Sequence, residues 1–133
     1  MPSNQYRQIL INNIIEQAKY YLEDAGEFYP FGTVISNSNL LKPVSGYFGE
    51  DTPDSIEVVN YLEEGIKDGI AKGIYLLGAI GIDILIPVQV NSSSVDKRDA
   101  LEIRLYQKDG KADKVYFLYS IKAGIYEFVN YDF

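Results

Sequence analysis

The chain of 133 residues contains no histidine, no cysteine and no tryptophan. Histidine is the only side chain whose unperturbed pKa lets its charge change near neutral pH, and cysteine is a strong nucleophile. Their absence excludes Ser-His-Asp hydrolases, thiol enzymes, zinc sites with histidine or cysteine ligands, and disulfide frameworks. We therefore predict no catalytic residue, no cofactor and no metal site.

The sequence also lacks a long apolar run and a secretion signal. Its longest apolar run, residues 73–82, ends at Asp83 after about ten residues, whereas a membrane-spanning helix needs roughly twenty. The first eight residues are polar, and no apolar run followed by a small-residue cleavage site comes after them. We expect a cytoplasmic protein that does not associate with a membrane.

Basic residues are few: 12 Lys and Arg stand against 19 Asp and Glu, which gives a net charge of −7. Nucleic-acid binding requires clustered Lys and Arg, so a nucleic-acid partner is not expected. The acidic balance suits a basic protein partner. The 12 tyrosines point the same way, because an apolar ring with a polar tip is common at protein interfaces.

Periodicity and turn residues predict two helices and about five strands. Residues 4–25 carry apolar side chains at helical spacing, and Gly26 stands where a helix C-terminal cap is expected. A second helix is predicted from the cap Thr52 and from Pro53 at its first position to Gly73. The predicted strands cover residues 27–36, 40–48, 74–90, 100–107 and 114–122, with a polar loop at 91–99.

This order, α-β-β-α-β-β-β, predicts a single α+β domain over residues 1–133. Short connections favour an antiparallel sheet of about five strands with both helices packed on one face. The aromatic C-terminal tail, residues 124–133, is predicted to dock on the domain as an edge strand of its own sheet, with packing onto a partner as the alternative, because such a tail would be unfavourable in water.

Strand alternation identifies a candidate interaction surface. The isoleucines at even positions from 80 to 86 are expected to face the helices together with Leu101, Ile103 and Leu105. The opposite, open face would then carry six candidate residues: Asp83, Glu102, Arg104, Tyr106, Tyr116 and Leu118.

Three interpretations of that face compete. It is a solvated surface in which Asp83 or Glu102 pairs with Arg104, a protein-binding or homodimer patch, or a site where two carboxylates act as acid and base. An acidic cluster at residues 50–57 could bind a cation, but charge at a helix N-terminus explains it without a metal.

Residues 28–32 (FYPFG) and 99–110 (DALEIRLYQKDG) resemble segments of small bacterial proteins without an established activity. This resemblance extends over most of the chain, and it transfers no catalytic residue. The leading hypothesis is a non-catalytic protein-interaction module, such as a bacterial immunity or adaptor protein, that binds through the open sheet face. The alternatives are a small-molecule-binding protein or carboxylate-dependent enzyme with a pocket between the first helix, the strand at Phe28 and Phe31 and the sheet, and a structural homo-oligomer.

Overall fold

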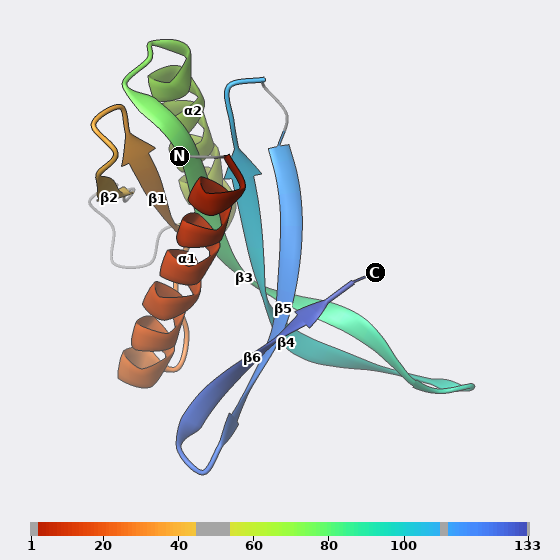
Figure 1. Cartoon of the computed structure of the whole chain (residues 1–133). Coiled ribbons are helices and arrows are strands. Elements are labelled where there is room, and N and C mark those ends of the chain that lie inside the picture. Colours follow the sequence, from red (N-terminus) through yellow and green to blue (C-terminus); the bar gives the residue numbers. More distant parts are fainter. Residues whose placement is uncertain (1–2, 45–53, 110–111, 133) are drawn as a thin grey trace.

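The computed structural model describes residues 3–44, 54–109 and 112–132. Two helices and a six-stranded antiparallel sheet make up these residues (Figure 1). In chain order the elements are α1 (Ser3–Ala25), β1 (Phe31–Ser36), β2 (Leu41–Val44), α2 (Ser55–Ala71), β3 (Tyr75–Asn91), β4 (Ser94–Tyr106), β5 (Ala112–Lys122) and β6 (Ile125–Tyr131). The predicted α+β class with an antiparallel sheet is confirmed, with six strands where about five were expected.

The strands are ordered β2-β1-β3-β4-β5-β6, and every neighbouring pair is antiparallel. The sixth strand comes from the predicted aromatic tail. The predicted polar loop at 91–99 is wrong, because β4 already begins at Ser94 and pairs with β3 from there. The second half of the strand predicted at 40–48, and the predicted cap Thr52 with Pro53, lie outside the described residues.

The first helix forms where the sequence predicts it. Leu10, Ile14, Ala18 and Leu22 recur at helical spacing, and all four are at most 2% exposed. Gly26 follows with a φ of 76°, a left-handed conformation that glycine adopts without steric cost. Its backbone N–H donates to the Leu22 carbonyl at 2.8 Å, which ends the helix.

The second helix begins one residue after Asp54, whose carboxylate accepts a hydrogen bond from the Ile56 N–H at 2.8 Å. This is the N-terminal cap, because it pairs a backbone donor that the helix itself cannot satisfy. Beyond Ala71 the chain turns at Gly73, whose φ of 74° is again left-handed.

The two helices cover opposite faces of the sheet, so the prediction that both lie on one face is wrong (Figure 1). Two glycines of β3 show this directly. A Cβ added at Gly81 would lie 2.8 Å from Ile14 of α1, whereas one added at Gly78 would lie 2.5 Å from Ile66 of α2. The physical reason is visible in the sequence, because the start of β3 is apolar at odd and even positions alike and can be buried on both sides.

Each face therefore has its own core. The α1 face of the sheet contributes Phe31, Ile35, Leu77, Ala79, Leu101, Ile103 and Leu105. The α2 face contributes Val34, Ile80, Ile82 and Tyr106. Neither helix carries a stretch that is both long and apolar enough to span a bilayer.

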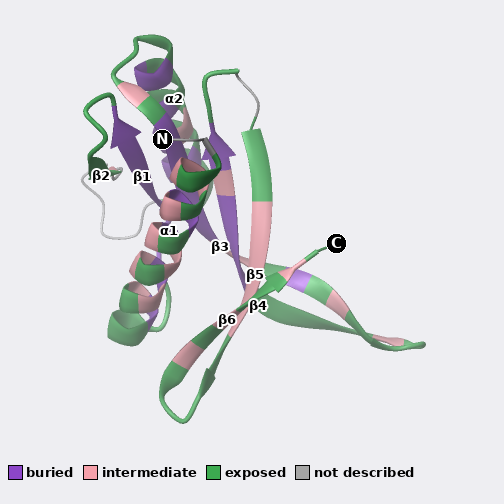
Figure 2. Cartoon of the chain, in the orientation of Figure 1, coloured by how far each residue is buried: buried purple, intermediate pink, exposed green. Residues whose placement is uncertain are grey.

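Two hairpins extend beyond the helices. Residues 84–99 of β3 and β4 form one arm, and residues 119–128 of β5 and β6 form the other, because pairing between β4 and β5 stops at Ala100 and Leu118. Figure 2 shows that both arms are largely exposed and that most of the buried chain lies where the helices cover the sheet. Ile86 on the β3 arm is an exception, at 4% exposed. Apolar side chains on these arms, such as Leu85 and Ile121, are 61% and 56% exposed.

Candidate functional site

The strand register divides the six predicted surface residues between the two faces of the sheet. Ile82 pairs with Glu102, which in turn pairs with Tyr116, so these three side chains share the α2 face. Asp83 pairs with Leu101 and lies on the α1 face. The predicted single open face is therefore wrong, because Asp83 was expected to share a face with Glu102 but pairs with Leu101, and directly paired residues lie on the same face.

Five of the six residues remain together on the α2 face: Glu102, Arg104, Tyr106, Tyr116 and Leu118. Tyr106 is nevertheless only 3% exposed, because it lies in the core beneath α2. Its hydroxyl donates to Glu63 of α2 at 2.5 Å. Tyr106 therefore attaches α2 to the sheet and is not part of an open surface.

Arg104 is held between two carboxylates. Its Nε donates to Glu102 at 2.6 Å, and its Nη1 lies 3.9 Å from Glu63. Glu63 also lies 3.5 Å from Lys67, and the Tyr106 hydrogen bond and the Lys67 charge lower the pKa of this carboxyl. The predicted pairing of Glu102 with Arg104 is present, and the charges of this network cancel.

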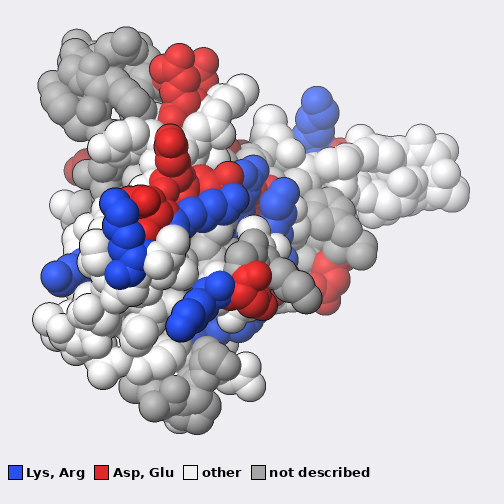
Figure 3. Space-filling model, turned by 90° about the horizontal axis from the view of Figure 1, so that it is seen from above, with Lys and Arg blue, Asp and Glu red and all other residues white. Residues whose placement is uncertain are grey.

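Charges of both signs are also mixed on the larger scale. On the face that is seen from above, Figure 3 shows acidic and basic side chains side by side, with no patch of a single sign. Such a surface does not resemble the clustered Lys and Arg of a nucleic-acid-binding protein.

Beyond α2, an apolar row crosses four strands of the same face. The register aligns Ile84 of β3, Ala100 of β4, Leu118 of β5 and Val129 of β6, and we call these four residues the outer apolar row. Exposure rises outward along it: Ala100 is buried, Leu118 is half-buried, and Val129 is 61% exposed.

Ile84, at the inner end of the outer apolar row, packs against the α2 core. Among the described residues no helix lies over Leu118 and Val129, since α2 packs mainly against β3 and β1. Two tyrosines, Tyr116 and Tyr131, pair directly beside the row on the same face. On the same side of the row, toward α2, a depression of about 200 Å³ lies between the start of α2 and the sheet, lined by Ile56, Ile82 and Arg104 among others. The result is an apolar strip with tyrosines and a fixed ion pair at its border.

Asp83 lies in different surroundings, at the edge of the α1 core. The Tyr119 hydroxyl donates to its carboxylate at 2.6 Å. Burial raises the pKa of Asp83, the Asp99 and Glu27 carboxylates raise it further, and hydrogen bonds from Tyr119 and from the Phe28 backbone N–H partly offset the rise. Burial and the bond to Asp83 also raise the pKa of Tyr119.

Replacing Asp83→Asn should increase the free energy of unfolding at pH 7. A carboxyl whose pKa is raised on folding stabilises the folded state at pH values below its usual pKa of 3.8. This stabilisation is lost as the pH rises through the pKa that the carboxyl has in the folded protein. The gain from Asp83→Asn should therefore be present at pH 7 and disappear near pH 3, as measured by urea denaturation at both pH values. Asp96→Asn, at an exposed residue of the β3–β4 arm, is the control; a loss of stability in Asp83→Asn at pH 7 would contradict the prediction.

The placement of Asp83 also bears on catalysis. Asp83 and Glu102 lie on opposite faces of one sheet, so they cannot act as acid and base on the same substrate. Of the acidic cluster predicted at residues 50–57, Glu50 and Asp51 lie outside the described residues, and Asp54 caps α2.

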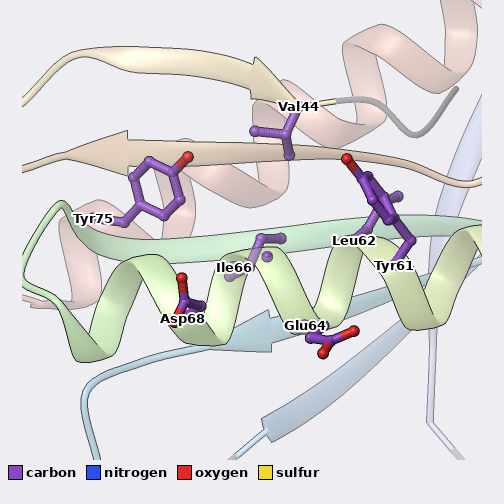
Figure 4. A pocket seen from close by; sticks show the side chains of 8 residues that line it. Val44, Tyr61, Leu62, Glu64, Ile66, Asp68 and Tyr75 are labelled. Carbon is purple, nitrogen blue, oxygen red and sulfur yellow. The ribbon is translucent and has the colours of Figure 1, made fainter.

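Among the described residues, one cavity of about 370 Å³ lies between the start of α1 and the sheet, lined by Leu10, Leu77 and Leu105 among others. Two more lie beside the helices. One of about 340 Å³ at the end of α1 is lined by Tyr21, Phe28 and Phe31, where the sequence predicted a pocket. A second, of about 480 Å³, opens beside α2, with Tyr61 and Tyr75 at its two ends (Figure 4). Neither Asp83 nor Glu102 lines either cavity, so the carboxylates proposed for catalysis do not lie in these pockets.

Comparison with known proteins adds no function to this geometry. No protein-family model, no curated protein and no solved structure matches the chain. The function must therefore be argued from the surface itself.

Sequence reasoning missed several residues that the fold brings to these sites. Glu63 and Tyr119 contact Tyr106 and Asp83 across long distances in the chain, which no local pattern indicates. Val129 and Tyr131 had a detectable signal, because the tail alternates as a strand does. The tail was expected to dock, but its contribution to the candidate surface was not anticipated.

Proposed function

We propose that this protein is a non-catalytic protein-interaction module that binds its partner through the uncovered part of the α2 face. The observation that carries the proposal is the outer apolar row, which crosses four strands without a helix over its exposed end. An apolar strip bordered by tyrosines and by a fixed Arg–Glu pair matches the composition of protein interfaces.

The site would act by covering a surface of the partner, as an immunity or adaptor protein does. Leu118 and Val129 would supply the apolar contact, and Tyr116 and Tyr131 would add ring contacts at its border. Arg104 is held in place by Glu102 and Glu63 before binding, so little side-chain freedom is lost there when the partner binds.

Substituting Leu118→Ser together with Val129→Ser should abolish capture of a stoichiometric partner from native lysate. With the captured partner purified, its affinity for the double variant should fall by about 30- to 700-fold, because two apolar contacts at an interface centre are worth roughly 1–2 kcal/mol each. Affinity would be measured by calorimetry, with thermal unfolding as the check on the fold.

The matched control is Leu85→Ser with Ile121→Ser, which removes two exposed apolar side chains from the other face of the same two hairpins. This pair should retain the partner. Equal loss of binding in both double variants, or no loss in either, would refute the assignment to the α2 face. Oligomerisation of the wild type that only Leu118→Ser with Val129→Ser disrupts would instead favour the structural homo-oligomer.

A further inference from the structure

The two edges of the sheet are protected to very different degrees. β2 forms one edge with four residues, and Pro43 removes one backbone donor from it. β6 forms the other edge with seven residues and no proline. Proteins usually blunt their edge strands, because an open edge is a template for another strand.

The hairpin that connects β5 and β6 determines which backbone groups of β6 point outward. Its two loop residues, Ala123 and Gly124, have φ values of 51° and 79°, as in a two-residue type I′ turn. In such a hairpin the flanking residues, Lys122 and Ile125, form a hydrogen-bonded pair.

Alternation along β6 then assigns the other residues. Ile125, Glu127, Val129 and Tyr131 direct their backbone groups toward β5, and the β5–β6 pairing shows no register shift. Tyr126, Phe128 and Asn130 direct their N–H and C=O groups away from the sheet. These groups recur every second residue, which is the spacing that one antiparallel strand presents to another.

The charges around this edge select the kind of strand that fits. Glu127 lies within β6 and Asp132 directly after it, and β6 contains no Lys or Arg. Lys122 lies 3.7 Å from Glu127 and offsets one of these two acidic charges, so a single negative charge remains in excess at this edge.

Aromatic rings lie on the α1 face beside the edge, and the Asp83 carboxylate lies farther in, on β3. The rings of Tyr126 and Phe128 lie 6.3 Å and 5.8 Å from Tyr119, which itself binds the Asp83 carboxylate. A Lys or Arg side chain is attracted both by aromatic faces and by carboxylates.

We propose that β6 accepts an extended, basic segment of another protein as a seventh, antiparallel strand. This inference rests on the proposed interaction function and specifies the partner: β6 borders the outer apolar row, so a strand added there would extend the same binding face. Charge complementarity favours a basic partner over a second copy of this chain, because each copy has a net charge of −7.

The test uses two synthetic nine-residue peptides with blocked ends, one alternating lysine and valine and the other alternating glutamate and valine. The whole protein should bind the lysine peptide at least about tenfold more tightly than the glutamate peptide, as measured by fluorescence anisotropy of labelled peptide, with the difference shrinking at high salt.

Asn130→Pro is the decisive variant, because it removes an outward N–H at an exposed residue and leaves the bonds to β5 in place. It should weaken binding of the lysine peptide about tenfold, whereas Asn130→Ala, which keeps the N–H, should stay within about twofold. Thermal unfolding shows whether both variants remain folded. If Asn130→Pro is destabilised, binding of the wild-type protein to a lysine peptide N-methylated at alternate residues replaces this test.

Equal affinity for both peptides, no binding of either, or unchanged binding by Asn130→Pro would overturn the inference. A wild-type dimer in sedimentation that Asn130→Pro dissociates would also overturn it, since a second copy would then occupy the edge. If Leu118→Ser with Val129→Ser prevents partner binding and Asn130→Pro does not, the proposed function stands and only the added strand is refuted.

Discussion

Leu101→Ala should lower the free energy of unfolding by about 2–5 kcal/mol, the range for removing a fully buried leucine side chain. Leu101 is 0% exposed and lies in the core between the sheet and α1. The loss combines the apolar surface that is no longer buried with the cavity that remains, and a rigid strand in the middle of a sheet cannot close that cavity. Urea denaturation with linear extrapolation measures it.

The control for Leu101→Ala is Leu85→Ala, on the same face and in the paired strand β3. Leu85 is 61% exposed, so its truncation should change stability by no more than about 0.5 kcal/mol. If the two variants lost the same free energy, the placement of the α1 core would be wrong.

Gly78→Val should destabilise the protein by about 3 kcal/mol, at the upper end of the range for overpacked cores. An added Cβ would lie 2.5 Å from Cγ2 of Ile66 and 3.2 Å from Cγ1 of Val34. Both contacts are with branched side chains that have little freedom to move, so α2 must shift away from the sheet. Thermal and urea unfolding measure the loss.

Gly65→Ala is the matched control, because Gly65 lies on α2 with nothing within 4 Å of an added Cβ. An alanine there should stabilise the protein by about 0.5–1 kcal/mol through helix propensity. A Gly78→Val variant that is as stable as the wild type would show that α2 does not pack on this face of the sheet.

Much of the fold could be predicted locally. The end of α1 follows from an apolar stripe and from Gly26 directly after it, and both sequence signals lie within a few residues of each other. In the structure Gly26 has the positive φ that such a cap requires. The β5–β6 hairpin was harder, because its turn residues Ala123 and Gly124 are not among the strongest hairpin signals. The boundary of β4 was missed because charged residues such as Asp96 and Arg98 look like a loop, although on an exposed arm they are compatible with a strand.

The candidate site could be predicted only in part. Tyr116 and Leu118 were selected by alternation within one strand, and the structure keeps them on one face. Asp83 was assigned to the same face by alternation within its own strand, and its pairing with Leu101 places it on the other face. Register depends on pairing between strands, which alternation within each strand does not reveal.

The exclusion of function classes by composition depends on the sequence alone. The absence of histidine and cysteine and the acidic balance are independent of how the chain folds. These features leave an interaction module as the leading hypothesis, but they do not say which surface it uses.

The sequence by itself determined the α+β class, the positions of both helices and most strands, and the chemistry that is missing, because these follow from residue types and short-range spacing. Only the tertiary structure decided that the helices cover opposite faces, that Tyr106 is buried beneath α2, and that β6 ends the sheet beside an apolar row. These features depend on which distant segments pair and in which register, and the free energy of that choice comes from burying side chains across the whole sheet.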